Sequence, residues 1–164
     1  MLFDLKDLFE KQEKLDAEIH QKHNETYKST FQKRLLSYLV EVGEFANSTR
    51  CFKFWSNKGP EEKARVLDEY ADGLHFILSI GIALDYQFDT IDVDEPEDKE
   101  GTNLFLNCYS EFIEFSNEIT FENYIKAFTS FLQISYFLEI SSDDLIKAYY
   151  KKLEVNYIRQ ENNY

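Results

Sequence analysis

The chain of 164 residues is long enough for one domain with a sizeable hydrophobic core. Its composition, 43% hydrophobic and 16% aromatic, excludes a disordered chain, and its net charge of −13 excludes a general nucleic-acid-binding surface, which needs a basic patch. Five glycines and two prolines leave few turn signals, so long helices are favoured over many short strands.

Three helices are expected in the first half of the chain, at residues 2–23, about 30–47 and about 61–86. The polar segment 48–60 is expected to form a loop between the last two. Pro60 is expected near the first turn of the third helix, where its missing N–H costs least. Beyond Asp72 the third helix is apolar nearly all round, which indicates either a central buried helix or a subunit interface.

The second half begins with an acidic segment, 87–102, that we expect to be a solvated loop, because the ligand and glycine spacing of an EF-hand is absent. Three further helices are expected, at residues about 103–118, 121–139 and 142–158. Thr120 and either Ser141 or Ser142 are expected as helix N-caps, and Ser141 has Asp144 three residues on, as in a capping box. The sequence therefore predicts a single all-α domain, residues 1–164, built as a bundle of about five to six helices.

Three features of the sequence indicate the cellular location. The N-terminal segment lacks the basic start and apolar run of a signal peptide, and the longest apolar stretch, Leu74–Leu84, is too short to span a bilayer. Cys51 and Cys108 stand apart without metal-binding spacing, which suits a reducing compartment. We expect a cytoplasmic protein that binds neither membrane nor nucleic acid.

Two acidic pairs have identical spacing inside apolar helices: Glu41 with Glu44, and Glu69 with Asp72. At i,i+3 both side chains of a pair share one helix face, so two packed helices would bring four carboxylates together. Carboxylates that converge repel one another and are costly to desolvate, so a cation should lie among them. Hard oxygen ligands select Mg²⁺ or Mn²⁺, and Mg²⁺ in proteins usually acts on phosphate oxygens.

Spacing alone is weak support for a metal site. With 31 acidic residues in 164, chance predicts about six acidic pairs at this spacing, and most are solvated helix faces. The two pairs differ from the rest in context, because Glu41 and Glu44 lie beside an apolar stripe and the face of the second pair continues to Phe76, with His75 alongside. A metal site and a solvated acidic face both stay open on the pattern alone.

Three further clusters carry polar groups suited to a nucleotide. Each also has an ordinary explanation, as a basic loop, a solvated terminal helix or a surface glutamine. Lysine and arginine donors fit phosphate oxygens, and amides fit sugar and base oxygens. The residues are Lys53, Trp55 and Lys58 in the first loop, Lys152, Asn156, Arg159 and Gln160 on one face near the C-terminus, and Gln12 on the first helix.

Taken together, these residues resemble the dimeric dUTPases, all-α dUTP diphosphatases related to the MazG-type nucleotide pyrophosphatases. The Phe-Lys-x-Trp segment and the Asn-x-x-Arg-Gln tail narrow the resemblance to dUTPases, and it covers nearly the whole chain. Asn163 stands where relatives often have Gly, and Asp16 where some carry an amide. The matching segments are Gln12–Leu15, Glu41-Val-Gly-Glu44-Phe-Ala-Asn47, Arg50-Cys-Phe-Lys53-Phe-Trp55, Asp68-Glu69-Tyr-Ala-Asp72-Gly-Leu-His75-Phe76, Lys152–Gln160 and Tyr164.

The resemblance implies a role for each of these residues and a homodimer. A water held by the metal and by Glu41 would attack a phosphorus atom of dUTP and release dUMP and pyrophosphate. The implied contacts are Mg²⁺ at Glu41, Glu44, Glu69 and Asp72, phosphates at Lys152 and Arg159, sugar at Asn156, the uracil face at Phe76 and its edge at Gln12, with His75, Lys53 and Trp55 completing the pocket.

An amide such as Gln12 offers one donor and one acceptor, which match O4 and N3–H of uracil. The amide could also turn over to suit cytosine, so selectivity must come from whatever fixes its orientation. Two alternatives stay open at this point. One is a broader MazG-type nucleoside triphosphate pyrophosphatase, and the other is a helical binding protein without activity whose acidic residues are merely solvated.

Overall fold

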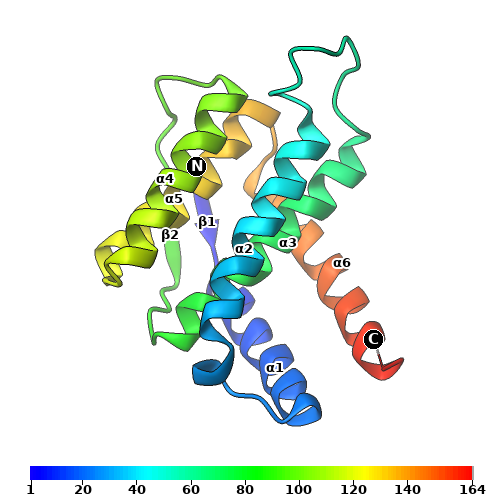
Figure 1. Cartoon of the computed structure of the whole chain (residues 1–164), viewed down its shortest axis with the longest axis vertical. Coiled ribbons are helices and arrows are strands. Elements are labelled where there is room, and N and C mark those ends of the chain that lie inside the picture. Colours follow the sequence, from blue (N-terminus) through cyan, green and yellow to red (C-terminus); the bar gives the residue numbers. More distant parts are fainter. Residues whose placement is uncertain (164) are drawn as a thin grey trace.

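The structure, a computed structural model, describes residues 1–163, which fold into six helices and one short two-stranded ribbon (Figure 1). Tyr164, where the resemblance ends, lies outside the described residues. The all-α expectation is confirmed. The helices are α1 (Lys6–His23), α2 (Tyr27–Thr49), α3 (Lys63–Ala83), α4 (Gly101–Asn117), α5 (Phe121–Leu138) and α6 (Ser142–Glu161), and the strands are β1 (Leu2–Asp4) and β2 (Thr90–Asp92).

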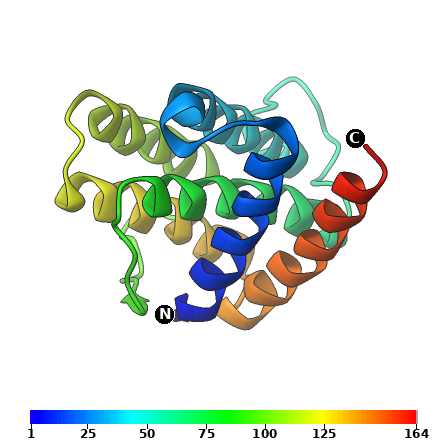
Figure 2. The same cartoon turned by 90° about the horizontal axis from the view of Figure 1, so that it is seen from below.

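Helix α3 occupies the centre of the bundle and packs against α2, α6 and α1, while α4 and α5 form a second packed pair. Seen from below, α1 and α6 run beside each other next to α3 (Figure 2). Aromatic rings connect the α2–α3 pair with the α4–α5 pair. Phe45 of α2 stacks on Tyr70 of α3 with ring centroids 4.4 Å apart, and both rings contact the Phe131 ring of α5. This shared core holds α2 and α3 in a fixed register.

The apolar part of α3 is a central buried helix, the first of the two alternatives. Leu74, Ile77, Leu78 and Ile80 are each 0% exposed, and their contacts lie within the same chain. Burial on every side explains why this segment shows no polar face. Within residues 1–163, no helix combines the length and the apolar character needed to cross a bilayer.

Three boundary expectations were wrong in detail. Residues 2–4 are a strand, not the start of the first helix, because Phe3 points into the core and pairs with Ile91 in an antiparallel register. The same pairing places β2 inside the acidic segment expected to be a loop. Pro60 lies ahead of α3, which begins at Lys63, because the Glu61 N–H donates to the Ser48 carbonyl at 2.9 Å and holds this segment outside the helix.

The expected N-caps are confirmed. The Thr120 side chain accepts a hydrogen bond from the Asn123 N–H at 3.2 Å, and the Ser141 side chain accepts one from the Asp144 N–H at 3.1 Å. Each bond satisfies one of the amide donors that a helix start leaves without a partner. The Ser141 cap sets where α6 begins and so which of its residues face α3.

Candidate active site

Three acidic side chains converge where α2 packs on α3. Glu41 of α2 and Glu69 and Asp72 of α3 each place one carboxylate oxygen within 4.8 Å of the others. Glu69 is buried, and Glu41 and Asp72 are half-buried. Glu44 lies nearly one turn further along α2 and is exposed, outside this group of three. The structure therefore brings the two predicted pairs to one place, with three of the four carboxylates in direct convergence.

The pKa of each of the three converging carboxyl groups is raised. Burial, followed by the charges of Asp72, Glu44 and Glu69, raises the pKa of Glu41 to about 7. Burial is also the largest cause that raises the pKa of Glu69 and of Asp72. The contribution of Glu44 to Glu41 and Glu69 shows that its charge is felt at the cluster. A hard divalent cation with oxygen ligands fits this donor set and would relieve the repulsion.

Two cationic side chains already lie against the cluster. Lys152 of α6 is 4% exposed, and its Nζ lies 2.7 Å from Asp72 Oδ2 and 3.0 Å from Asp68 Oδ2. Burial acts to lower the pKa of Lys152, but the two carboxylates, Asp72 first, raise it. Arg65 pairs with Glu69 and with Asp68. Neither Arg65 nor Asp68 was among the residues predicted for the site, although Arg65 stands four residues before Glu69, a spacing that favours ion pairs.

A cavity of about 390 Å³ opens beside the carboxylates, a volume within the range of about 300–1,000 Å³ common for small-molecule sites. It brings together predicted residues from α1, α2, α3 and α6. Phe76 is half-buried and leaves part of its ring accessible to a ligand. The lining residues are Gln12, Leu15, Asp16, Ile19, Arg34, Glu41, Asp72, His75, Phe76, Ser79, Asn156, Arg159 and Gln160.

Lys53 and Trp55 do not line this cavity. Both belong to the segment between α2 and α3, which projects from one end of that helix pair (Figure 1). Trp55 is 65% exposed and packs edge-on against the rings of Phe52 and Phe54. Arg50 binds the Ser56 hydroxyl at 2.7 Å within the same segment. The structure thus separates these two predicted residues from the others.

A buried polar network forms the wall of the cavity between α1, α3 and α6. Gln12 Oε1 lies 2.6 Å from His75 Nδ1, and Gln12 Nε2 donates to Asp16 Oδ1 at 2.9 Å. The Tyr149 hydroxyl lies 3.2 Å from Gln12 Oε1, and the Ser79 hydroxyl donates to Asp16 Oδ2 at 2.6 Å. Asp16 stands four residues after Gln12 and Ser79 four after His75, so helical spacing could have linked each pair.

Arg34 is a further lining residue that the sequence analysis did not identify. It is 9% exposed, its Nη2 lies 2.5 Å from His20 Nε2, and its guanidinium lies 4.9 Å from the centre of the Tyr27 ring. Nothing in its sequence surroundings distinguishes it from other basic residues of α2. Arg34 therefore contributes a positive charge to the lining of the cavity.

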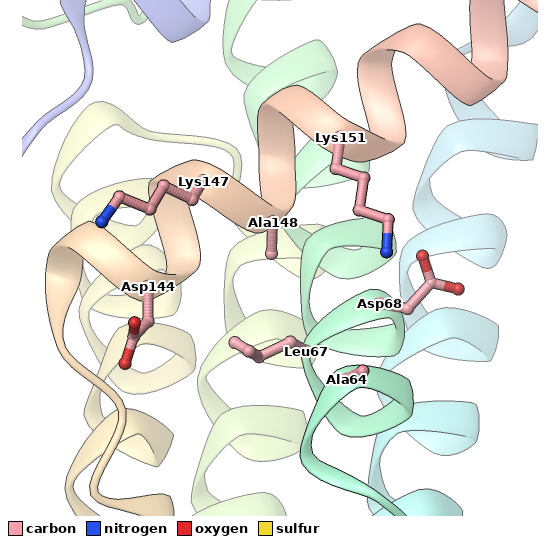
Figure 3. Close-up of a pocket in the computed structure, with 7 residues that line it drawn as sticks. All are labelled: Ala64, Leu67, Asp68, Asp144, Lys147, Ala148 and Lys151. Atoms are coloured by element: carbon pink, nitrogen blue, oxygen red, sulfur yellow. The ribbon is translucent and has the colours of Figure 1, made fainter.

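A second hollow, of about 240 Å³, lies between α3 and α6 (Figure 3). Lys147, Lys151 and Asp144 extend from α6 above Leu67 and Asp68 of α3. Among the described residues, none of those predicted for the site lines this hollow. It is therefore separate from the nucleotide-sized cavity.

The chain matches the family model described as dUTPase over residues 4–164. A comparison with curated proteins finds no match. The family match spans α1 to α6 and includes the convergent carboxylates and every residue that lines the cavity. The chain therefore belongs to the all-α dUTPase family, and its activity is that of a dUTP diphosphatase, a hydrolase.

Proposed function

We propose that Glu41, Glu44, Glu69 and Asp72 hold Mg²⁺, with Mn²⁺ as a substitute, against the triphosphate of dUTP. The observation that carries this proposal is the set of three carboxylate oxygens within 4.8 Å of one another. Burial, followed by the neighbouring carboxylates, raises the pKa of Glu41 to about 7, and a divalent cation would relieve the repulsion between these charges. When bound, Mg²⁺ would supply neutralisation of phosphate charge and activation of water.

The chain's own residues bind and orient the substrate in this proposal. Arg159 and Lys152 donate to phosphate oxygens, and Asn156 binds the sugar, since Asn156 and Arg159 line the cavity and Lys152 lies beside Asp72. Phe76 stacks on the uracil ring and Gln12 contacts its edge, next to His75.

Glu41 accepts the proton of the attacking water. The water oxygen bonds to phosphorus while the bond to the leaving oxygen breaks, which yields dUMP and pyrophosphate. Lys53 and Trp55 stay a prediction from the resemblance, because they lie outside the cavity lining.

The experiment compares Glu41→Gln and Asp72→Asn with the parent protein in release of pyrophosphate from dUTP with Mg²⁺. We expect kcat to fall by more than about 100-fold in each variant. Mutation of a residue that only hydrogen-bonds to a metal ligand often costs about 10- to 100-fold in activity, and loss of a ligand itself should cost more. Glu114→Gln is the matched control, because Glu111 and Glu114 form an acidic pair of the same spacing on α4. Full activity in Asp72→Asn would exclude this metal site. Equal rates on dUTP, dCTP, dTTP and UTP would exclude a preference for dUTP.

We also propose a homodimer formed through α2 and α4. Leu36 and Val40 of α2 are 63% and 49% exposed, and Leu106 and Ile113 of α4 are 62% and 44% exposed. The two helices are neighbours, because the Tyr109 hydroxyl of α4 donates to the Leu39 carbonyl of α2 at 2.9 Å. Large exposed apolar side chains on two neighbouring helices favour a partner surface.

A single domain and a cytoplasmic location complete the proposal. The single domain is supported by one continuous buried cluster with members from all six described helices. The cytoplasm is supported by Cys51 and Cys108, which are unpaired, because a reducing compartment keeps thiols free.

A further inference from the structure

The Gln12 amide is held by hydrogen bonds at both ends. Gln12 is 4% exposed, and its Nε2 donates to Asp16 Oδ1 at 2.9 Å. Its Oε1 lies 2.6 Å from His75 Nδ1 and 3.2 Å from the Tyr149 hydroxyl. Because an amide oxygen only accepts hydrogen bonds, the proton of the neutral His75 ring belongs on Nδ1.

Asp16 is itself immobilised by three donors. It is 2% exposed, and its Oδ2 accepts from the Ser79 hydroxyl at 2.6 Å and from the Tyr27 hydroxyl at 3.0 Å. Burial, with the charge of Asp16 after it, raises the pKa of Tyr27, so this hydroxyl keeps its proton. The occupied Oδ2 leaves Oδ1 for Gln12. Asp16 therefore acts as an acceptor fixed in one orientation.

Turning the amide over would break this arrangement at the Asp16 end. Gln12 Oε1 would then face Asp16 Oδ1, which is an acceptor against an acceptor. The neutral His75 ring could accept from a turned amide by carrying its proton on Nε2, 3.4 Å from the Tyr149 carbonyl, so Asp16 is the partner that decides the orientation. Buried groups left without partners are costly, so one orientation of Gln12 is strongly favoured. The second hydrogen on Nε2 is the one amide group that these contacts leave unused, and Gln12 lines the cavity.

We propose that Asp16 is a positioning residue that holds the Gln12 amide with one N–H toward the base. In this orientation the amide discriminates uracil from cytosine. The proposal rests on the proposed function, in which Gln12 contacts the base edge. A carbonyl oxygen, as in uracil, accepts from that N–H. The amino group of cytosine at the same place would oppose one donor with another, and a mismatched buried pair is rejected strongly.

The test measures kcat/KM for dUTP and for dCTP in the parent protein and in Asp16→Asn. The asparagine offers a donor as well as an acceptor, so Gln12 gains its second orientation. We expect the dUTP-to-dCTP ratio to fall by at least about tenfold, with a gain for dCTP that a merely structural defect would not give. Glu13→Gln is the matched control, since Glu13 is exposed on the same helix, and the ratio should stay at the parental value.

A double-mutant cycle with Gln12→Ala separates this inference from the proposed function. Gln12→Ala alone should lower the ratio, and Asp16→Asn should lower it no further in that background, because Asp16 acts through Gln12. If Asp16→Asn keeps the parental dUTP-to-dCTP ratio while Gln12→Ala lowers it, the positioning role of Asp16 is overturned and the base contact of Gln12 stands. A parental ratio in Gln12→Ala removes Gln12 from the base contact and overturns both.

A second variant keeps the test decisive if Asp16→Asn does not fold. Ser79→Ala removes one donor from Asp16 Oδ2 and leaves the carboxylate in place. The orientation of Asp16 is then held by Tyr27 and Gln12, so we expect a smaller fall in the ratio, about two- to fivefold. A folded Ser79→Ala protein with the parental ratio overturns the inference.

Discussion

At the scale of single residues, burial sets the charge of His75. Its imidazole is 5% exposed and stacks on the Tyr149 ring with centroids 4.2 Å apart. Burial is the largest cause that lowers the pKa of His75 to about 3. The Tyr149 carbonyl acts to raise this pKa, and the charge of Lys152 acts to lower it. His75 is therefore neutral in the folded protein at neutral pH, which leaves its Nδ1–H to bind Gln12.

This shift makes stability depend on pH. In the unfolded chain His75 has the ordinary histidine pKa of about 6.5. Between about pH 6.5 and about pH 3 the unfolded state therefore binds a proton at His75, whereas the folded state does not. The contribution of His75 to the free energy of unfolding is complete above about pH 6.5. It falls with decreasing pH by about 1.4 kcal/mol per pH unit across the window.

The variant His75→Asn removes this titration. We expect the stability difference between parent and variant to shrink by about 1.4 kcal/mol per pH unit below about pH 6.5, measured by urea unfolding at successive pH values. His23→Asn, which changes an exposed histidine at the end of α1, should give a difference that does not follow this slope. A pH-independent difference for His75→Asn would contradict the buried, neutral imidazole.

At the scale of elements, close packing of an aromatic ring on α3 positions the second acidic pair. Gly73 follows Asp72 directly, and a Cβ built there would lie 2.8 Å from Phe131 Cε2 of α5. Phe131 is fully buried, and its ring meets those of Tyr38 and Tyr70. The Phe131 ring therefore cannot move away, and α5 packs directly against the turn of α3 that carries Asp72.

We therefore expect Gly73→Ala to destabilise the protein. Overpacking of a filled core costs about 1–3 kcal/mol, and the better helix propensity of alanine returns about 1 kcal/mol, so the expected net loss is up to about 2 kcal/mol. Gly43→Ala on α2 is the matched control, since its Cβ meets only the Tyr109 hydroxyl at 3.0 Å. Thermal unfolding should show a lower Tm for Gly73→Ala alone, and equal Tm values for the two variants would be evidence against this packing account.

At the scale of the whole molecule, α2 and α4 leave large apolar side chains exposed to solvent, and the proposed dimer would cover them. Leu36 on α2 and Ile113 on α4 lie on the outside of two packed helices whose inner faces bury Tyr38 and Phe112 against each other, with ring centroids 4.1 Å apart. The core is therefore complete without these outer residues. Their exposure supports an interface with a second copy of the chain.

A negative charge on this face should disrupt the dimer. We expect Leu36→Glu to raise the dissociation constant by at least about 30-fold, because a charge buried in an apolar interface costs about 2 kcal/mol or more. Sedimentation velocity over a concentration series measures this change, and circular dichroism verifies that α2 stays folded. Ile158→Glu on α6, where Ile158 is 55% exposed, is the control and should leave the oligomeric state unchanged. A dimer of unchanged affinity in Leu36→Glu would exclude the α2–α4 face.

The features that the sequence determined by itself are local. Helical periodicity, the caps at Thr120 and Ser141 and the i,i+3 spacing of the acidic pairs all depend on residues within one or two turns of one another. For that reason the all-α fold and the shared helix face of each acidic pair could be predicted from the chain alone, whereas the convergence of Glu41, Glu69 and Asp72 required α2 to pack on α3.

Other features depend on residues far apart in the chain and emerge when the helices pack. The pairing of Phe3 with Ile91, the contact of Lys152 with Asp72 and the contact of Tyr149 with Gln12 each join distant segments, the last across 137 positions. No local pattern encodes such pairs, because packing of whole helices brings them together. The Gln12 amide, whose orientation the sequence left open, donates to Asp16, and Ser79 in turn binds Asp16.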